Sequence, residues 1–192
     1  ANTRKWIFAS NKTKNKGTFT WSGGIINGNG VNQGEEIEPD HDVSRSFQLM
    51  NFYKVEISNV LIKDIAGHAI AHWGNEYAHF HDIEIRQGIS PTHPTGGSRR
   101  DGITGSSKNL VFENLKGFVD DDFIAVCAGW DWVGSGSTVN VENVYVKNIQ
   151  LERNIQDPTF GCFRGFAVYS REGFTVKNLV VDGVFGYVNT EC

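Results

Sequence analysis

No stretch of the chain is apolar over the roughly 18 residues that a membrane-spanning helix needs. A basic stripe is also missing, and the formal net charge is −4, so the composition argues against a nucleic-acid partner. No cationic segment followed by an apolar one opens the sequence, so no signal peptide is visible. The composition therefore predicts a soluble globular protein without a membrane or nucleic-acid partner.

Cysteine and proline are scarce. The three cysteines, Cys127, Cys162 and Cys192, fit neither a metal-ligand spacing nor a disulfide framework, which leaves the redox compartment undecided. Four prolines stand against 22 glycines, a balance that favours many tight turns. A chain of 192 residues holds one domain with a substantial core, so we expect residues 1–192 to form a single domain.

What the sequence does contain is an internal repeat. In VEISNVLIKDI (residues 55–65), apolar and polar residues alternate on both sides of Asn59. Four later segments align with it, HFHDIEIRQG, LVFENLKGF, VNVENVYVKNI and FTVKNLVVDGV, and they place Asp82, Asn114, Asn143 and Asn178 at the same position. The copies follow one another at intervals of 23 to 35 residues, which indicates one structural unit with loops of variable length.

This repeat predicts an all-β parallel β-helix, a solenoid of about six stacked coils. We expect the shared polar positions to form one ladder along it, made by Asn59, Asp82, Asn114, Asn143 and Asn178. Neither end of the sequence supplies an obvious cap for the solenoid. We therefore expect this domain to be part of a longer chain or of a homotrimer or other oligomer.

A second strand precedes each repeat motif. The segments RSFQL, HAIAH, DGITG, DFIAV and RGFAV align, and their leading residues are Arg45, His68, Asp101, Asp122 and Arg164. Equivalent positions on successive coils lie about 4.8 Å apart, so Asp101 and Asp122 should be stacked neighbours. The sequence places Asp121 one residue earlier and Asp120 two residues earlier than Asp122.

Such a cluster suits acid–base chemistry. Like charges about 5 Å apart raise the pKa of one carboxyl, while a nearby cation lowers that of another, which yields a proton donor and a base at one pH. Two alternatives stay open from the spacing alone: a calcium site at Asp120–Asp122, and a solvated turn.

The motifs RRDGI and DDDFIAV, together with segments from GGIINGNG to NLVVDGV, resemble the pectin-lyase-like right-handed β-helix superfamily. The closest similarity is to polygalacturonase-type glycoside hydrolases, whose pattern matches Asp101, Asp121 and Asp122. This resemblance implies a right-handed β-helix with an acidic sugar-cleaving groove. It further implies that Asp122 donates a proton to the leaving oxygen while Asp101 and Asp121 activate water for an inverting attack.

The chain departs from that pattern in two places. Arg164 stands where the family has a histidine, and the family's later Arg-Ile-Lys motif is absent. The sequence RRDG followed by an Asp-Asp strand looks more like β-helical depolymerases of bacteriophage tails and of bacteria, which attack surface glycans or teichoic acids. An extracellular or virion-tail location follows from this resemblance.

Several other side chains are candidates for substrate binding. Arg100 and Arg164 could hold an anionic group, Trp130 and Trp132 could stack on a sugar ring, and His68 and His72 begin and end one strand of the same column. The histidines lack the three- or four-residue spacing of a helical zinc site, so no metal ligands are assigned.

Two classes of function therefore remain. The first is an enzyme that cleaves an anionic polysaccharide or a glycan-phosphate polymer. The second is a non-catalytic β-helix that binds a glycan or forms a fibre shaft.

Overall fold

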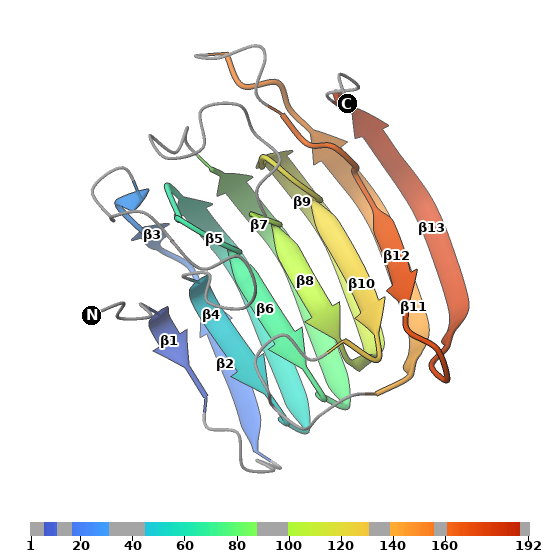
Figure 1. Cartoon of the computed structure of the whole chain (residues 1–192). Coiled ribbons are helices and arrows are strands. Elements are labelled where there is room, and N and C mark those ends of the chain that lie inside the picture. Colours follow the sequence, from blue (N-terminus) through green and yellow to red (C-terminus); the bar gives the residue numbers. More distant parts are fainter. Residues whose placement is uncertain are drawn as a thin grey trace.

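The protein is built from parallel strands. The structure is a computed structural model that describes residues 6–10, 17–30, 45–87, 100–130, 139–155 and 161–188. Thirteen strands and no helix occur in these ranges (Figure 1). In particular, they contain no helix that is long and apolar enough to cross a membrane.

The strands form two sheets. Sheet A runs in the order β1 (Trp6–Ala9), β4 (Arg45–Met50), β6 (Ile70–Trp73), β8 (Ile103–Ser106), β10 (Ile124–Ala128) and β12 (Ala167–Ser170). Sheet B runs in the order β2 (Thr18–Ser22), β5 (Lys54–Lys63), β7 (Tyr77–Arg86), β9 (Lys108–Phe118), β11 (Val141–Leu151) and β13 (Val176–Gly186), and β3 (Ile25–Asn27) also pairs with β5. Strands of sheet A are short, whereas those from β5 onward in sheet B have 10 or 11 residues.

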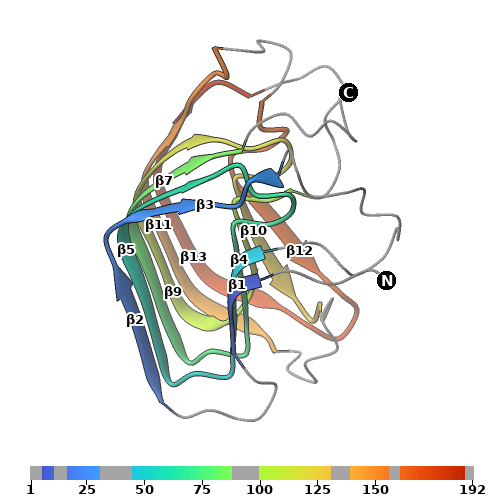
Figure 2. The ribbon, with the colours of Figure 1, turned by 90° about the vertical axis from the view of Figure 1, so that its left-hand side faces the viewer.

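From β4 to β13 the chain visits the two sheets in turn, and every strand pairs in parallel with the next strand of its own sheet. Seen along the stack, the two sheets face each other (Figure 2). The predicted all-β class and the stacking of parallel strands in sequence order are thus confirmed, and the arrangement is consistent with a parallel β-helix-like solenoid.

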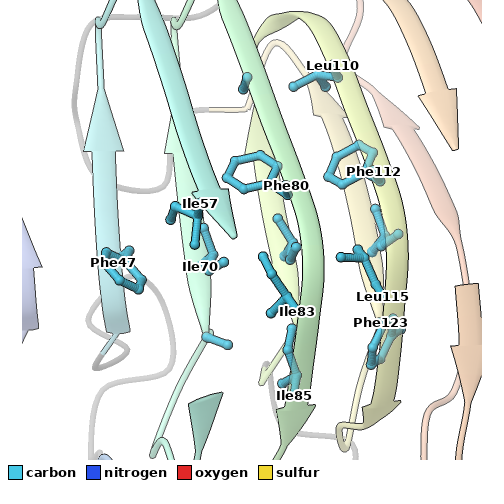
Figure 3. Close-up of a cluster of buried hydrophobic side chains, with 14 of the residues drawn as sticks. Phe47, Ile57, Ile70, Phe80, Ile83, Ile85, Leu110, Phe112, Leu115 and Phe123 are labelled. Carbon is cyan, nitrogen blue, oxygen red and sulfur yellow. The ribbon is translucent and has the colours of Figure 1, made fainter. Parts of the chain in front are cut away.

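The core lies between the sheets. It is made of apolar side chains that alternate along each strand, among them Phe47 of sheet A and Ile57, Phe80 and Phe112 of sheet B, all fully buried (Figure 3). The rings of Phe80 and Phe112 stack with centroids 5.6 Å apart. The same kind of side chain therefore repeats on successive strands, as the alignment of the repeat requires.

The asparagine ladder differs from the predicted one. One ladder joins the amide of Asn114 to Asp82 at 3.0 Å and the amide of Asn148 to Asn114 at 2.8 Å. Asn59 occupies the same register beside Asp82. Asn143 and Asn178 belong to a second ladder, which begins at Asn109 and has amide contacts of 2.8 Å at both steps. The prediction of a single five-residue ladder is therefore wrong.

The physical reason is that sheet B bends twice. Asn109 and Asn114 are five residues apart in β9, as are Asn143 and Asn148 in β11, and all four have φ between 47° and 59°. Asparagine tolerates this left-handed conformation better than most residues, so it marks both bends. Aligning the repeats on asparagine alone cannot distinguish one bend from the other, and the prediction joined the two.

Candidate functional site

The leading residues of the sheet A segments do lie in one row, which we call the entry column: Arg45, His68, Asp101, Asp122 and Arg164. Ile70, Ile103 and Ile124 are register partners on β6, β8 and β10, so the residues two places before each of them are aligned as well. Asp122 and Arg164 form a parallel bridge of their own. The predicted stacking of Asp101 beside Asp122 is therefore confirmed.

Glycine allows the strands to approach at this point. Gly102 directly follows Asp101, and its amide donates to the carbonyl of Asp122 at 2.9 Å. A Cβ atom at position 102 would collide with the carbonyl oxygen of Phe123. The Asp-Gly pair therefore brings the Asp101 coil close to the Asp122 coil.

Three carboxylates converge at the column. One oxygen from each of Asp101, Asp121 and Asp122 lies within 4.8 Å of the others. Asp101 and Asp122 are buried, with 5% and 2% of their surface exposed, whereas Asp121 is half-buried. The backbone amide of Asp122 also donates to Oδ1 of Asp101 at 3.3 Å. The structure thus gathers the three aspartates that the sequence assigned to catalysis.

Both oxygens of Asp122 already accept hydrogen bonds. Arg164 Nε donates to Oδ1 at 2.5 Å, and the hydroxyl of Tyr169 donates to Oδ2 at 2.7 Å. A second nitrogen of Arg164 lies 3.6 Å from Asp121. Burial and the bond to Asp122 raise the pKa of Tyr169, so it remains a neutral donor. The carboxyl group of Asp122 is therefore held between a permanent cation and a phenol.

Asp101 has a different environment. Burial, followed by the charges of Asp121 and Asp122, raises the pKa of Asp101 well above its usual range. His68 does not offset this, because burial and the neighbouring Arg45 lower the pKa of His68 well below its usual value. Its Nδ1 accepts a hydrogen bond from the Asp101 backbone amide at 3.1 Å, as only a neutral imidazole can. Asp101 thus favours its protonated form.

Asp120 is a structural residue rather than a member of the cluster. Its carboxylate pairs with Arg100, and both side chains are almost completely buried. Burial raises the pKa of Asp120 to about 6, although Arg100 opposes the shift. Asp120 therefore lies outside the group of three carboxylates, and a calcium ion at that group would have to compete with Arg164 for Asp122.

The remaining predicted substrate-binding residues are scattered. His72 is fully buried against Phe80 and Phe112, where burial lowers its pKa to about 3, so it faces the core. Trp130 is half-buried, and the guanidinium of Arg171 lies 4.3 Å from its ring centroid. Trp132 lies outside the described residues. Among the cations, Arg164 reaches the carboxylates, whereas Arg100 binds Asp120.

Tyr169 is the residue that sequence reasoning missed. It lies on β12, opposite Cys127 of β10, on the outer side of sheet A. The available signal was its parity: along RGFAVYS, Tyr169 alternates with Val168, whose register partner Val126 lies in the core. That parity predicts a position on the outer face but not the hydrogen bond to Asp122.

Comparison with known proteins leaves the family open. No protein-family model, curated protein or solved structure matches the chain.

Proposed function

We propose that the protein is an extracellular or virion-tail depolymerase of the glycoside hydrolase type, which cleaves an anionic glycan at the Asp101–Asp121–Asp122 cluster. We also propose that the fold is a right-handed β-helix of about six coils, of the pectin-lyase-like kind. No bound calcium is part of the proposed chemistry. The resemblance of the RRDGI and DDDFIAV motifs supplies the reaction class.

The observation that carries the proposal is the unequal environment of the aspartates. One oxygen of each carboxylate lies within 4.8 Å of the other two. Asp122 pairs with Arg164, whereas Asp101 is buried beside the two other acidic groups. Repulsion between the carboxylates would not benefit a fibre shaft. An acid–base pair needs it, because it separates the pKa values of the two groups.

The hydrogen bonds that Arg164 and Tyr169 donate to Asp122 lead us to assign the roles of the three aspartates differently from the family pattern. Asp122 has both oxygens engaged as hydrogen-bond acceptors, so it positions its neighbours rather than donating the proton. Asp101 retains the proton and gives it to the leaving oxygen. Asp121 is the most exposed of the three, so it takes the proton from the attacking water. The resemblance implies inversion, whereas separations of about 5 Å are typical of retaining enzymes, so the first anomer released identifies the stereochemistry.

Arg164 supports an anionic substrate. Its side chain is 55% exposed although it touches two carboxylates, so part of its guanidinium faces solvent. A guanidinium binds a carboxylate or a phosphate but does not exchange a proton near neutral pH. The same observation supports the second candidate, a teichoic-acid depolymerase that cleaves phosphodiesters.

The test is a screen of the purified chain against capsular, pectic and teichoic polymers. New reducing ends indicate glycosidic cleavage, and new phosphomonoesters indicate phosphodiester cleavage. We expect Asp101→Asn and Asp121→Asn each to lower the rate on the cleaved polymer by about 100-fold or more, because each removes a proton donor or acceptor.

Asp182→Asn is the matched control, because Asp182 is an exposed aspartate on β13. It should cleave at the parent rate. If Asp101→Asn, Asp121→Asn and Asp122→Asn all retain the parent rate while remaining folded, the cluster is a binding surface and the enzyme proposal fails.

A further inference from the structure

An ion pair lies directly beside the carboxylate cluster. Arg100 immediately precedes Asp101, and Asp120 immediately precedes Asp121, so each member of the pair is next in sequence to a member of the cluster. Nε of Arg100 donates a hydrogen bond to Oδ2 of Asp120. Their side chains are 4% and 0% exposed, and we therefore call them the buried pair. The pair joins the two segments of chain that carry the three aspartates.

The backbone links these two segments on only one side. Within the described ranges, the first backbone hydrogen bond between them runs from the Gly102 amide to the Asp122 carbonyl at 2.9 Å, and the strand pairing continues from there. No backbone hydrogen bond among the described residues joins residues 100–101 to residues 119–121. The buried pair supplies a link where the backbone does not.

A link is needed at this point because the cluster repels itself. The charges of Asp121 and Asp122 add to burial in raising the pKa of Asp101. Arg164 contacts Asp121 and Asp122, but these two belong to the same segment, so it does not draw Asp101 toward them. His68 does not do so either, because burial and a neighbouring arginine lower its pKa and keep it neutral. The buried pair, in contrast, attracts one segment to the other.

Stability alone is a weak reason for such a pair. Taking two charges out of water costs free energy that their attraction repays only in part, so apolar side chains of similar size often serve the fold as well. What a buried arginine–carboxylate contact adds is a directional, charge-assisted hydrogen bond that fixes the positions of its partners. Arg100 is also too deeply buried to hold a substrate anion directly.

We propose that Arg100 and Asp120 are positioning residues whose ion pair holds Asp101 against Asp121 and Asp122. Neither residue touches the substrate, and both act through the three aspartates. The geometric part of this inference stands without any reaction, whereas its consequence for catalysis rests on the proposed hydrolase function.

The experiment removes the pair without changing the net charge, by combining Arg100→Met with Asp120→Leu in the full chain. The two segments should then move apart, so the Asp101 carboxyl becomes more exposed and more distant from two like charges. Both changes lower its pKa, and we expect its titration midpoint to fall by about one unit or more. Carbon-13 NMR of protein labelled at the aspartate carboxyls measures the midpoint. The Asp101 signal is the one that Asp101→Asn lacks.

Lys147→Gln combined with Glu113→Gln is the matched control. These residues form another pair between successive coils, 3.5 Å apart on the outer face of sheet B, and their replacement also leaves the net charge unchanged. The control should keep the parent midpoint for Asp101.

Arg100→Met alone gives a second measurement, which decides the matter if the double variant does not fold. Asp120, whose pKa is about 6 beside Arg100, would then take up a proton instead of remaining an unpaired buried charge. Loss of a nearby positive charge by itself raises the pKa of Asp101, whereas loss of the link lowers it. The direction of the shift therefore separates the two effects, and we expect a fall.

A folded variant of either kind in which Asp101 titrates at or above the parent midpoint would overturn the proposal, as would an equal fall in the control. Circular dichroism verifies folding. If neither variant folds, the pair is required for the fold itself and the proposal also fails.

The catalytic consequence is measured on a polymer that the parent cleaves. We expect the double variant to lower kcat at least tenfold with little change in KM, because the surfaces that contact the substrate are retained. A parent-like kcat would show that the pair does not position the cluster for catalysis. If the parent cleaves no polymer, the hydrolase proposal fails, while the titration of Asp101 still tests the positioning role.

Discussion

Asp101 illustrates how a side chain can serve a site and weaken the fold. Its carboxyl group is buried, its neighbours Asp121 and Asp122 are acidic, and its pKa is well above the usual range. Ionising this group in the folded protein is therefore unfavourable, whereas in the unfolded chain it ionises near pH 4. Asp101 should therefore contribute least to the free energy of unfolding at pH values at which it is ionised in the folded protein.

The pH dependence of this effect has a definite sign. Between the unfolded and the folded pKa, the folded protein keeps the proton and the unfolded chain releases it. The contribution of Asp101 to the free energy of unfolding is thus fully present below about pH 4 and is lost as the pH rises through the folded pKa. We expect Asp101→Asn to be more stable than the parent at pH 7, by on the order of 1 kcal/mol or more, with the difference shrinking toward pH 4.

Urea unfolding of both proteins at pH 4, 5, 6 and 7 measures this difference. Asp64→Asn, which replaces a partly exposed aspartate, is the control and should show no comparable trend. A difference between Asp101→Asn and the parent that does not change with pH would show that Asp101 carries no unusual proton.

At the scale of a single coil, the bends of sheet B are stabilised by both conformation and hydrogen bonding. Asn114 has φ 53°, its amide donates to Asp82, and its carbonyl accepts from Asn148. Alanine in that conformation costs about 1–2 kcal/mol, whereas glycine adopts it freely. The two effects can therefore be separated by substitution.

We expect Asn114→Ala to lower the free energy of unfolding by about 1–3 kcal/mol, from backbone strain and the lost ladder bonds. Asn114→Gly loses the same bonds without the strain, so it should cost less. Chemical denaturation of the two variants measures both values. Equal losses would mean that the left-handed bend contributes nothing, and no loss in either variant would remove the ladder as a source of stability.

These elements also show what the sequence could and could not predict. The entry column was predictable because each leading residue is followed by apolar or small residues of a buried strand, which fixes its register. The ladders were not, because asparagines five residues apart mark two equivalent bends. The hydrogen bond from Tyr169 to Asp122 could not be predicted either, because it depends on where the Tyr169 hydroxyl packs between coils.

At the scale of the whole molecule, the stack leaves part of its core uncovered. Among the described residues, β13 is the terminal strand of sheet B. Its inward side chains Leu179 and Val181 are 39% and 46% exposed, although their register partners Val144 and Val146 on β11 are buried. An unpaired edge with exposed apolar side chains is a template for pairing with another chain.

We therefore expect this chain to self-associate through the β13 end, which is one of the two expectations from the sequence, an oligomer or a longer chain. Val181→Lys should weaken association at least tenfold, because it places a charge on the apolar surface that a partner would bury. Val180→Lys is the matched control: Val180 is a neighbouring exposed valine on the same strand, paired in register with the half-exposed Tyr145, and it points away from the core. Sedimentation velocity over a range of protein concentrations measures the association, and circular dichroism verifies that each variant is folded. A parent chain that stays monomeric throughout, or equal behaviour of the two lysine variants, would show that the uncovered core at β13 does not mediate assembly.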